Sequence, residues 1–82
     1  MVSSIVKLAK LALSDVDKKK VIALLDCVNL TNQERELIER TELAGERVYD
    51  KAEVYALSVD AVSLIKSRAL WKIGVYLARN LQ

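Results

Sequence analysis

The sequence predicts a single all-α domain of about five helices. The chain has 82 residues, no proline and only two glycines, and it is rich in the strong helix formers Ala, Leu, Glu, Lys and Arg. Its composition is 52% hydrophobic and 29% charged, which is typical of a folded chain and not of a disordered one. We expect residues 1–20 to form an N-terminal helical extension and residues 21–82 to form the main module.

Two helices are predicted in the first third of the chain. Apolar residues recur at helical spacing over residues 3–13, namely Ile5, Leu8, Ala9 and Ala12. Ser14 and Asp17 stand three residues apart, in the spacing of a capping box, and predict the start of a second helix over residues 15–28. The apolar face of this second helix consists of Val21, Leu24, Leu25 and Val28.

The third helix has the clearest start signal. Thr31 and Glu34 have the spacing at which each side chain satisfies the backbone N–H of the other. Gly45 is expected to end this helix, because glycine adopts the left-handed conformation that closes a helix without steric cost. A short fourth helix is predicted over residues 47–56.

The sequence lacks the residues that most enzyme mechanisms require. The chain has no histidine, and its two glycines stand too far apart to form a phosphate-binding loop. Cys27 is the only cysteine and has apolar neighbours, so we expect a buried structural thiol in a reducing cytosol. Five glutamates are expected to form a solvated face: Glu34, Glu36, Glu39, Glu42 and Glu46. We therefore expect no enzyme, no metal site and no cofactor.

A membrane partner is not expected either. No charge-free run approaches the ~20 residues that span a bilayer. Lys7 and Lys10 interrupt the apolar N-terminus, which argues against a signal peptide. A basic amphipathic membrane helix is an alternative at this end, but a core helix or a dimer helix explains the pattern as well. We expect a cytoplasmic protein.

Residues 48–67 fit the frame of a helix-turn-helix. Ala52 is small where the two helices must approach each other closely, and Ser58 can cap the second helix, which is predicted over residues 59–80. Four apolar residues are expected to point inward: Val54, Leu57, Val62 and Ile65. In this motif a short helix braces a longer one, which can then enter the major groove of DNA.

A longer segment, residues 30–73, "LTNQERELIERTELAGERVYDKAEVYALSVDAVSLIKSRALWKI", resembles region 4 of sigma factors and, less closely, the LuxR-type response-regulator domain. The resemblance rests on the helix start from Thr31 to Glu36, the loop glycine Gly45, the packing alanine Ala52 and the closing "IKSRALWKI". It implies a small transcription regulator that binds double-stranded DNA and acts either as a homodimer or together with RNA polymerase. We expect a stand-alone module of this kind and not a full sigma factor, because 82 residues cannot hold the DNA-melting segments.

The resemblance also implies which residues contact DNA. The residues at the start of the fifth helix and facing the bases would be Ser58, Val59, Asp60, Ala61, Ser63, Leu64 and Ser67. The phosphate contacts would be Lys66, Arg68 and Lys72, so that binding would fall steeply with salt.

Several positions depart from the family pattern. Ala56 occupies the turn position that is usually glycine, Lys51 replaces an apolar residue, and Arg47 replaces the usual capping serine or threonine. The positions that face the bases contain no Arg, Gln or Asn, although such side chains make the bidentate contacts that discriminate between bases.

A second apolar stripe on the fifth helix supports a different function. Leu64, Trp71, Val75 and Ala78 lie roughly opposite the core face, with Arg68 among them. An exposed tryptophan beside leucine and arginine is typical of an interface hot spot. The alternative is therefore a protein-interaction or dimerisation module that uses Leu64, Trp71 and Val75. A third possibility is that the helix over residues 3–13 folds back and covers this stripe.

Overall fold

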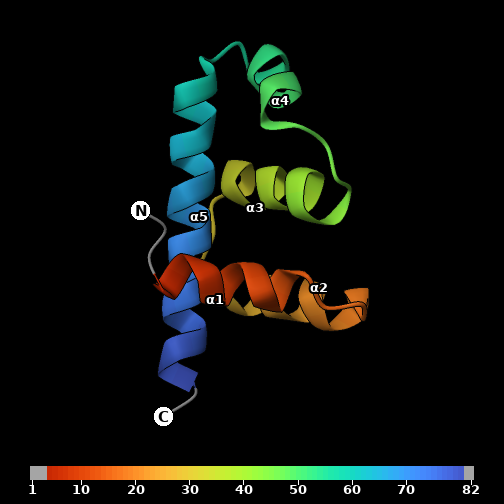
Figure 1. Ribbon diagram of the computed structural model, residues 1–82, viewed down its shortest axis with the longest axis vertical. Coiled ribbons are helices and arrows are strands. Elements are labelled where there is room, and N and C mark those ends of the chain that lie inside the picture. The colour runs from red at the N-terminus through yellow and green to blue at the C-terminus, as the bar shows by residue number, and fades with distance from the viewer. Residues whose placement is uncertain (1–3, 81–82) are drawn as a thin grey trace.

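The computed structural model describes residues 4–80, and within them the chain forms five α-helices, one short π-helical segment and no strand. The elements in chain order are α1 (Ser4–Leu13), α2 (Lys18–Cys27), α3 (Asn32–Ile38), the π-helical segment η1 (Glu39–Leu43), α4 (Val48–Tyr55) and α5 (Val59–Asn80). Figure 1 shows that α5 runs along the long axis of the molecule and that the other helices pack along its length. The predicted all-α fold of five helices is confirmed, while residue 3, the predicted first residue of the first helix, lies outside the described residues.

The N-cap of α2 differs from the prediction. Asp17 is the N-cap, and its side chain accepts a hydrogen bond from the backbone N–H of Lys19 at 3.1 Å. The Ser14 hydroxyl instead donates to the backbone oxygen of Leu11 at 2.7 Å and so belongs to the end of α1. The predicted pairing of Ser14 with Asp17 is wrong, because a separate turn ends α1 before α2 begins.

The start of α3 is as predicted. Thr31 is the N-cap; the Glu34 N–H donates to Thr31 Oγ1 at 3.1 Å, and the Thr31 N–H donates to Glu34 Oε1 at 2.9 Å. The helix then widens into η1, a feature that no pattern in the sequence predicts. Gly45 follows with φ +74°, the left-handed conformation expected of it.

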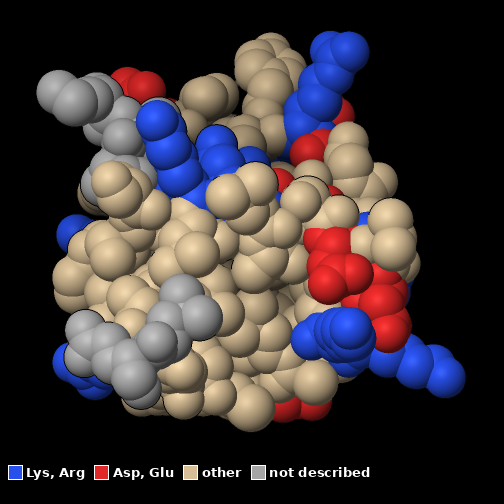
Figure 2. Space-filling model, turned by 60° about the horizontal axis from the view of Figure 1, so that its bottom comes forward, with Lys and Arg blue, Asp and Glu red and all other residues tan. Residues whose placement is uncertain are grey.

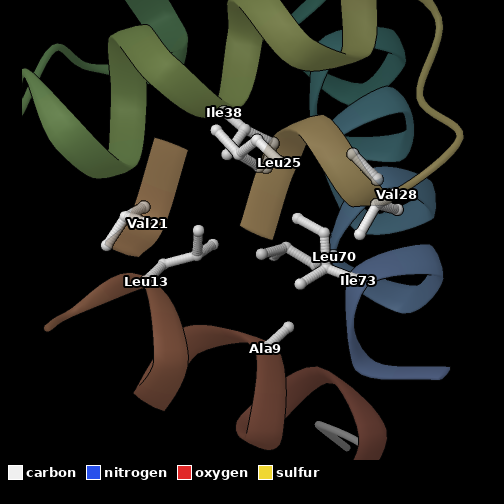
Figure 3. Packing of buried hydrophobic residues seen from close by; sticks show 9 residues of the cluster. Ala9, Leu13, Val21, Leu25, Val28, Ile38, Leu70 and Ile73 are labelled. Carbon is white, nitrogen blue, oxygen red and sulfur yellow. The ribbon is translucent and has the colours of Figure 1, made fainter. Parts of the chain in front are cut away.

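Two hydrophobic cores lie along α5. The main core joins α1, α2, the end of α3 and the C-terminal half of α5, and Figure 3 shows its side chains converging between these helices. The buried residues of this core are Ala9, Leu13, Val21, Leu25, Val28, Ile38, Ala69, Leu70 and Ile73. A smaller core of Leu37, Ala52 and Val62 joins α3 and α4 to the N-terminal half of α5. Since Ala9 and Leu13 are in the main core, α1 is an integral part of the packing.

Gly74 allows α1 to cross α5 at close range. A Cβ atom at this position would lie 2.6 Å from Ile5 Cγ2 and 2.8 Å from the Ile5 carbonyl carbon, distances that real Cβ atoms essentially never show. A helical glycine costs roughly 0.5–1 kcal/mol relative to alanine. The cost is offset here because the missing side chain lets two backbones touch.

Candidate interaction surface on helix α5

A tight left-handed turn joins α4 to α5. Ala56 has φ 55° and ψ 38°, so alanine adopts the conformation usually taken by glycine. The Leu57 N–H donates to the Ala52 carbonyl at 3.0 Å and the Ala56 N–H donates to the Glu53 carbonyl at 3.2 Å, which is the hydrogen-bond pattern of a Schellman motif. The Ser58 hydroxyl then accepts from the Ala61 N–H at 3.1 Å and caps α5 as predicted.

Helix α4 presents a different face inward from the one expected. Ala52 and Val62 are buried as predicted, but Val54 is 68% exposed and Leu57 is 39% exposed. The inward face of α4 consists of Val48, Lys51, Ala52 and Tyr55, which recur at three- and four-residue spacing. The predicted inward positions of Val54 and Leu57 are therefore wrong, because another face of α4 packs against the smaller core.

Lys51 occupies one of these inward positions with its charge paired. Its Nζ lies 2.8 Å from Glu46 Oε1, and only 10% of its side chain is exposed. The hydrogen bond from Lys51 is the largest cause of the lowered pKa of Glu46. The apolar stem of Lys51 fills the space that an apolar residue would fill, while its ammonium group reaches a carboxylate.

Both of the lysines expected to contact phosphate are paired with glutamates. Lys66 Nζ lies 3.0 Å from Glu42 Oε1, and Lys72 Nζ lies 2.7 Å from Glu34 Oε1. Glu34 is only 6% exposed, so the predicted solvated face is wrong for this residue. Burial alone would raise the pKa of Glu34, but the hydrogen bonds from Lys72 and from the Thr31 backbone outweigh it, and the pKa is lowered.

The second apolar stripe of α5 is open to solvent. Leu64 is 52% exposed and Trp71 is 54% exposed, while Val75 and Ala78 are half-buried. Within the described chain, Arg68 is exposed and forms no ion pair. Helix α1 crosses α5 at Gly74, and its residue Val6 lines a hollow together with Trp71, yet about half of the Trp71 side chain remains exposed.

Hollows lie on both sides of the Trp71 ring. One has a volume of about 690 Å³ and is lined by residues of α1, α3 and α5 that include Val6, Gln33 and Arg68. The other has a volume of about 440 Å³ and is lined by residues that include Asn29, Val75 and Arg79. Trp71 and Lys72 line both hollows, so the indole ring forms a ridge between them.

Cys27 lies at the second hollow and is exposed. The prediction of a buried thiol is wrong because Val21 and Leu25 of α2 and the following residue, Val28, point inward, whereas Cys27 does not lie on that face. A side-chain hydrogen bond with Cys27 raises the pKa of Tyr76.

The positions expected to face DNA bases lie in an acidic environment. Val59, Asp60, Ser63 and Ser67 are exposed, and Ala61 is half-buried. In residues 47–64 the exposed charges are those of Arg47, Asp50, Glu53 and Asp60, because the Lys51 charge is paired. The exposed groups of residues 47–64, which include most of these positions, therefore carry a net negative charge, unlike a surface that approaches phosphates.

The lower face of the molecule has a different character. Figure 2 shows that its centre is largely uncharged and that acidic and basic side chains gather around its margin. A further exposed apolar residue is Leu11 on α1, which is 72% exposed. Isolated exposed leucines are common on folded proteins, so this residue alone does not define a binding site.

The chain was compared with protein-family models, with curated proteins and with solved structures, and no match was found. The resemblance to sigma region 4 therefore stays a hypothesis that rests on the residues quoted above. Within residues 4–80, no cluster of three or more metal-ligating side chains occurs. No helix in that range has both the length and the apolar character needed to cross a membrane.

Proposed function

We propose that this protein is a protein-interaction module whose binding surface is the outer face of α5. The observation that carries the proposal is the exposed Trp71, with Leu64 and Val75 on the same stripe. Arg68 lies between them and has no ion-pair partner among residues 4–80. Tryptophan and arginine, together with tyrosine, are enriched among interface hot spots. The hollows on both sides of the ring can receive side chains of a partner.

The charges favour this function over DNA binding. Contact of Lys72 with a phosphate would break its ion pair with Glu34, a carboxylate that is 6% exposed. Leaving such a buried group without its partner costs about 1–3 kcal/mol. The net negative charge of residues 47–64 would also repel the DNA backbone.

DNA binding is the second candidate, and one observation favours it. The left-handed turn at Ala56 and the Ser58 cap hold α4 against an α5 whose first turns are exposed, as in a helix-turn-helix. Ser63 and Ser67 could bond base edges, and Arg68 could contact a phosphate. In that function the protein would act in the cytoplasm as a transcription regulator, alone or with RNA polymerase.

A binding measurement separates the two functions. The anisotropy of a fluorescein-labelled mixed-sequence duplex is followed during titration with the protein at roughly 50 and 200 mM salt, a range over which phosphate contacts weaken strongly. We expect no saturable binding at either salt concentration. Binding that falls with salt and is lost in Arg68→Ala would overturn the proposal in favour of DNA.

Affinity capture tests the protein surface directly. The wild-type chain, Trp71→Ala and Tyr49→Ala are immobilised and exposed to an extract of the cells that encode the protein, supplemented with untagged wild-type chain. Tyr49 is a matched control because it is an aromatic residue, 63% exposed, on α4. We expect Trp71→Ala to lose specific chains that both other baits retain. Identical sets on all three baits would contradict a binding role for Trp71.

A further inference from the structure

The outer face of α5 has the residue spacing of a helix–helix seam. Its residues follow one another at alternating three- and four-residue steps: Ala61, Leu64, Arg68, Trp71, Val75 and Ala78. This heptad spacing keeps one side of a helix against a partner helix. None of these residues is buried, whereas the core face of α5 uses Val62, Ala69 and Ile73.

The seam is complementary to itself when it is read in the opposite direction. If two copies of α5 lie antiparallel, with the centre between Ala69 and Leu70, Ala61 faces Ala78 of the other copy and Leu64 faces Val75. Arg68 then faces Trp71. A two-fold interface requires such self-complementarity. When residue i of the first copy contacts residue j of the second, residue j of the first copy must also contact residue i of the second.

We infer that the partner of the outer face of α5 is a second copy of this chain, docked antiparallel so that Arg68 of each copy lies on Trp71 of the other. This inference rests on the proposed function of the same surface. A guanidinium group on an indole face is a favourable cation–π pair. A parallel dimer would instead place the two Arg68 charges against each other, which is repulsive.

The charges beside the seam permit this dimer. Arg68 has no carboxylate partner within the described chain, so its charge is available to the Trp71 ring of the second copy. Lys72, at the edge of the seam, is already paired with Glu34 at 2.7 Å. The approach of two copies therefore does not bring two unpaired lysines together.

The surrounding helices leave the seam accessible. On a helical projection of 100° per residue, Gly74 lies about 40° from Ala78, about 60° from Trp71 and about 120° from Arg68, so α1 borders the C-terminal end of the seam. Leu64 and Trp71 are nevertheless 52% and 54% exposed. The hollows of about 690 and 440 Å³ beside the Trp71 ring provide space for side chains of a second copy. The seam is only about 26 Å long at 1.5 Å per residue, so the dimer is expected to be weak and concentration-dependent.

Sedimentation equilibrium measures the self-association. We expect wild-type protein to shift from monomer to dimer as its concentration rises, and Trp71→Ala to weaken the dimer at least about tenfold, as is usual for a central hot-spot residue. Tyr49→Ala should leave the association unchanged. Circular dichroism of each variant verifies that the fold is intact. A wild-type chain that stays monomeric at millimolar concentration would overturn the inference.

Disulfide trapping tests the antiparallel register. In a Cys27→Ser background, Leu64→Cys and Val75→Cys are prepared as separate proteins and oxidised alone or mixed. Antiparallel docking brings residue 64 of one copy near residue 75 of the other, within the ~7 Å Cα separation that a disulfide allows. We expect covalent dimers almost only in the mixture. Efficient trapping of Leu64→Cys with itself would indicate a parallel dimer and overturn the register.

The outcomes separate this inference from the function on which it rests. A monomeric protein whose bait captures other chains in a Trp71-dependent manner would overturn the self-association and leave the proposed function standing. A monomeric protein whose captured set does not depend on Trp71 would overturn both.

Discussion

At the scale of single residues, Gly74 determines how α1 meets the rest of the molecule. A side chain there would meet the backbone of Ile5, which cannot move aside as the end of a flexible side chain can. The position therefore tolerates no larger residue without displacement of α1. The same displacement would disturb Ala9 and Leu13 in the main core.

Gly74→Ala should destabilise the protein. Overpacking costs typically about 1–3 kcal/mol, while the better helix propensity of alanine returns only about 1 kcal/mol. We expect a lower free energy of unfolding in urea. Ser67→Ala, at an exposed position of the same helix, is the control and should change little. A Gly74→Ala protein more stable than wild type would show that the helices are not in close contact.

The ionisation of Glu34 makes the free energy of unfolding depend on pH. Burial alone would raise its pKa, but Lys72 and the Thr31 backbone lower it below the ordinary value of 4.5. A group whose pKa is lowered by folding stabilises the folded state above its unfolded pKa, and that contribution is lost as the pH falls through its folded pKa. Glu46 acts in the same direction, chiefly through its hydrogen bond with Lys51.

Glu34→Gln should therefore lower the melting temperature near neutral pH, and its difference from wild type should shrink as the pH falls below 4.5. Thermal unfolding followed by circular dichroism across this range checks the expectation. Glu53→Gln, at an exposed carboxylate on α4, is the control. A difference that does not vary with pH would mean that the Glu34 charge is not responsible.

At the scale of elements, α4 is the helix with the least local support. It spans Val48–Tyr55, and its N-cap, Arg47, makes no side-chain capping hydrogen bond although its backbone is extended. The other end depends on Ala56 in a left-handed conformation. Alanine is strained there by roughly 1–2 kcal/mol.

Arg47→Ser should stabilise the protein. A serine at this N-cap could accept a hydrogen bond from the first turn, and such a cap is worth typically about 1 kcal/mol over alanine. Urea unfolding of Arg47→Ser and Arg47→Ala checks the prediction, because both variants remove the charge and only one adds a cap. Equal stabilities would show that the start of α4 is not limited by capping.

The elements also show how far the sequence predicts the structure. Periodicity and capping signals are local, so they predicted α5, the Thr31–Glu34 box and the turn at Gly45 correctly. The inward face of α4 and the exposure of Cys27 depend on how helices rotate against each other, which no local pattern records. The partners of Lys66 and Lys72 lie far away in the chain, so their spacing within α5 could not indicate that Glu42 and Glu34 neutralise them. The exposed stripe with Trp71 was predictable because it needs only the helical repeat.

At the scale of the whole molecule, two cores of unequal size share α5. The main core has nine buried residues and the smaller core has three. Local stability follows the amount of buried apolar contact, so the two parts should open with different free energies. Helix α4 depends on the smaller core alone.

Amide hydrogen exchange should reveal this difference. We expect the α4 amides to exchange through a local opening of lower free energy than the amides of α2 and of the C-terminal half of α5. Measurement at low urea concentrations separates local openings from global unfolding. Leu37→Ala should accelerate exchange in α4 more than in α2. Uniform protection across all helices would indicate a single cooperative unit.

Trp71 also has a practical consequence. It is the only tryptophan in the chain, and it lies on the stripe proposed to bind a partner, about half exposed in the free protein. Its intrinsic emission should therefore be red-shifted and readily quenched by acrylamide when the stripe is free. Covering the ring should shift the emission to the blue and protect it from quenching, so the unlabelled protein reports optically on the occupancy of its own surface.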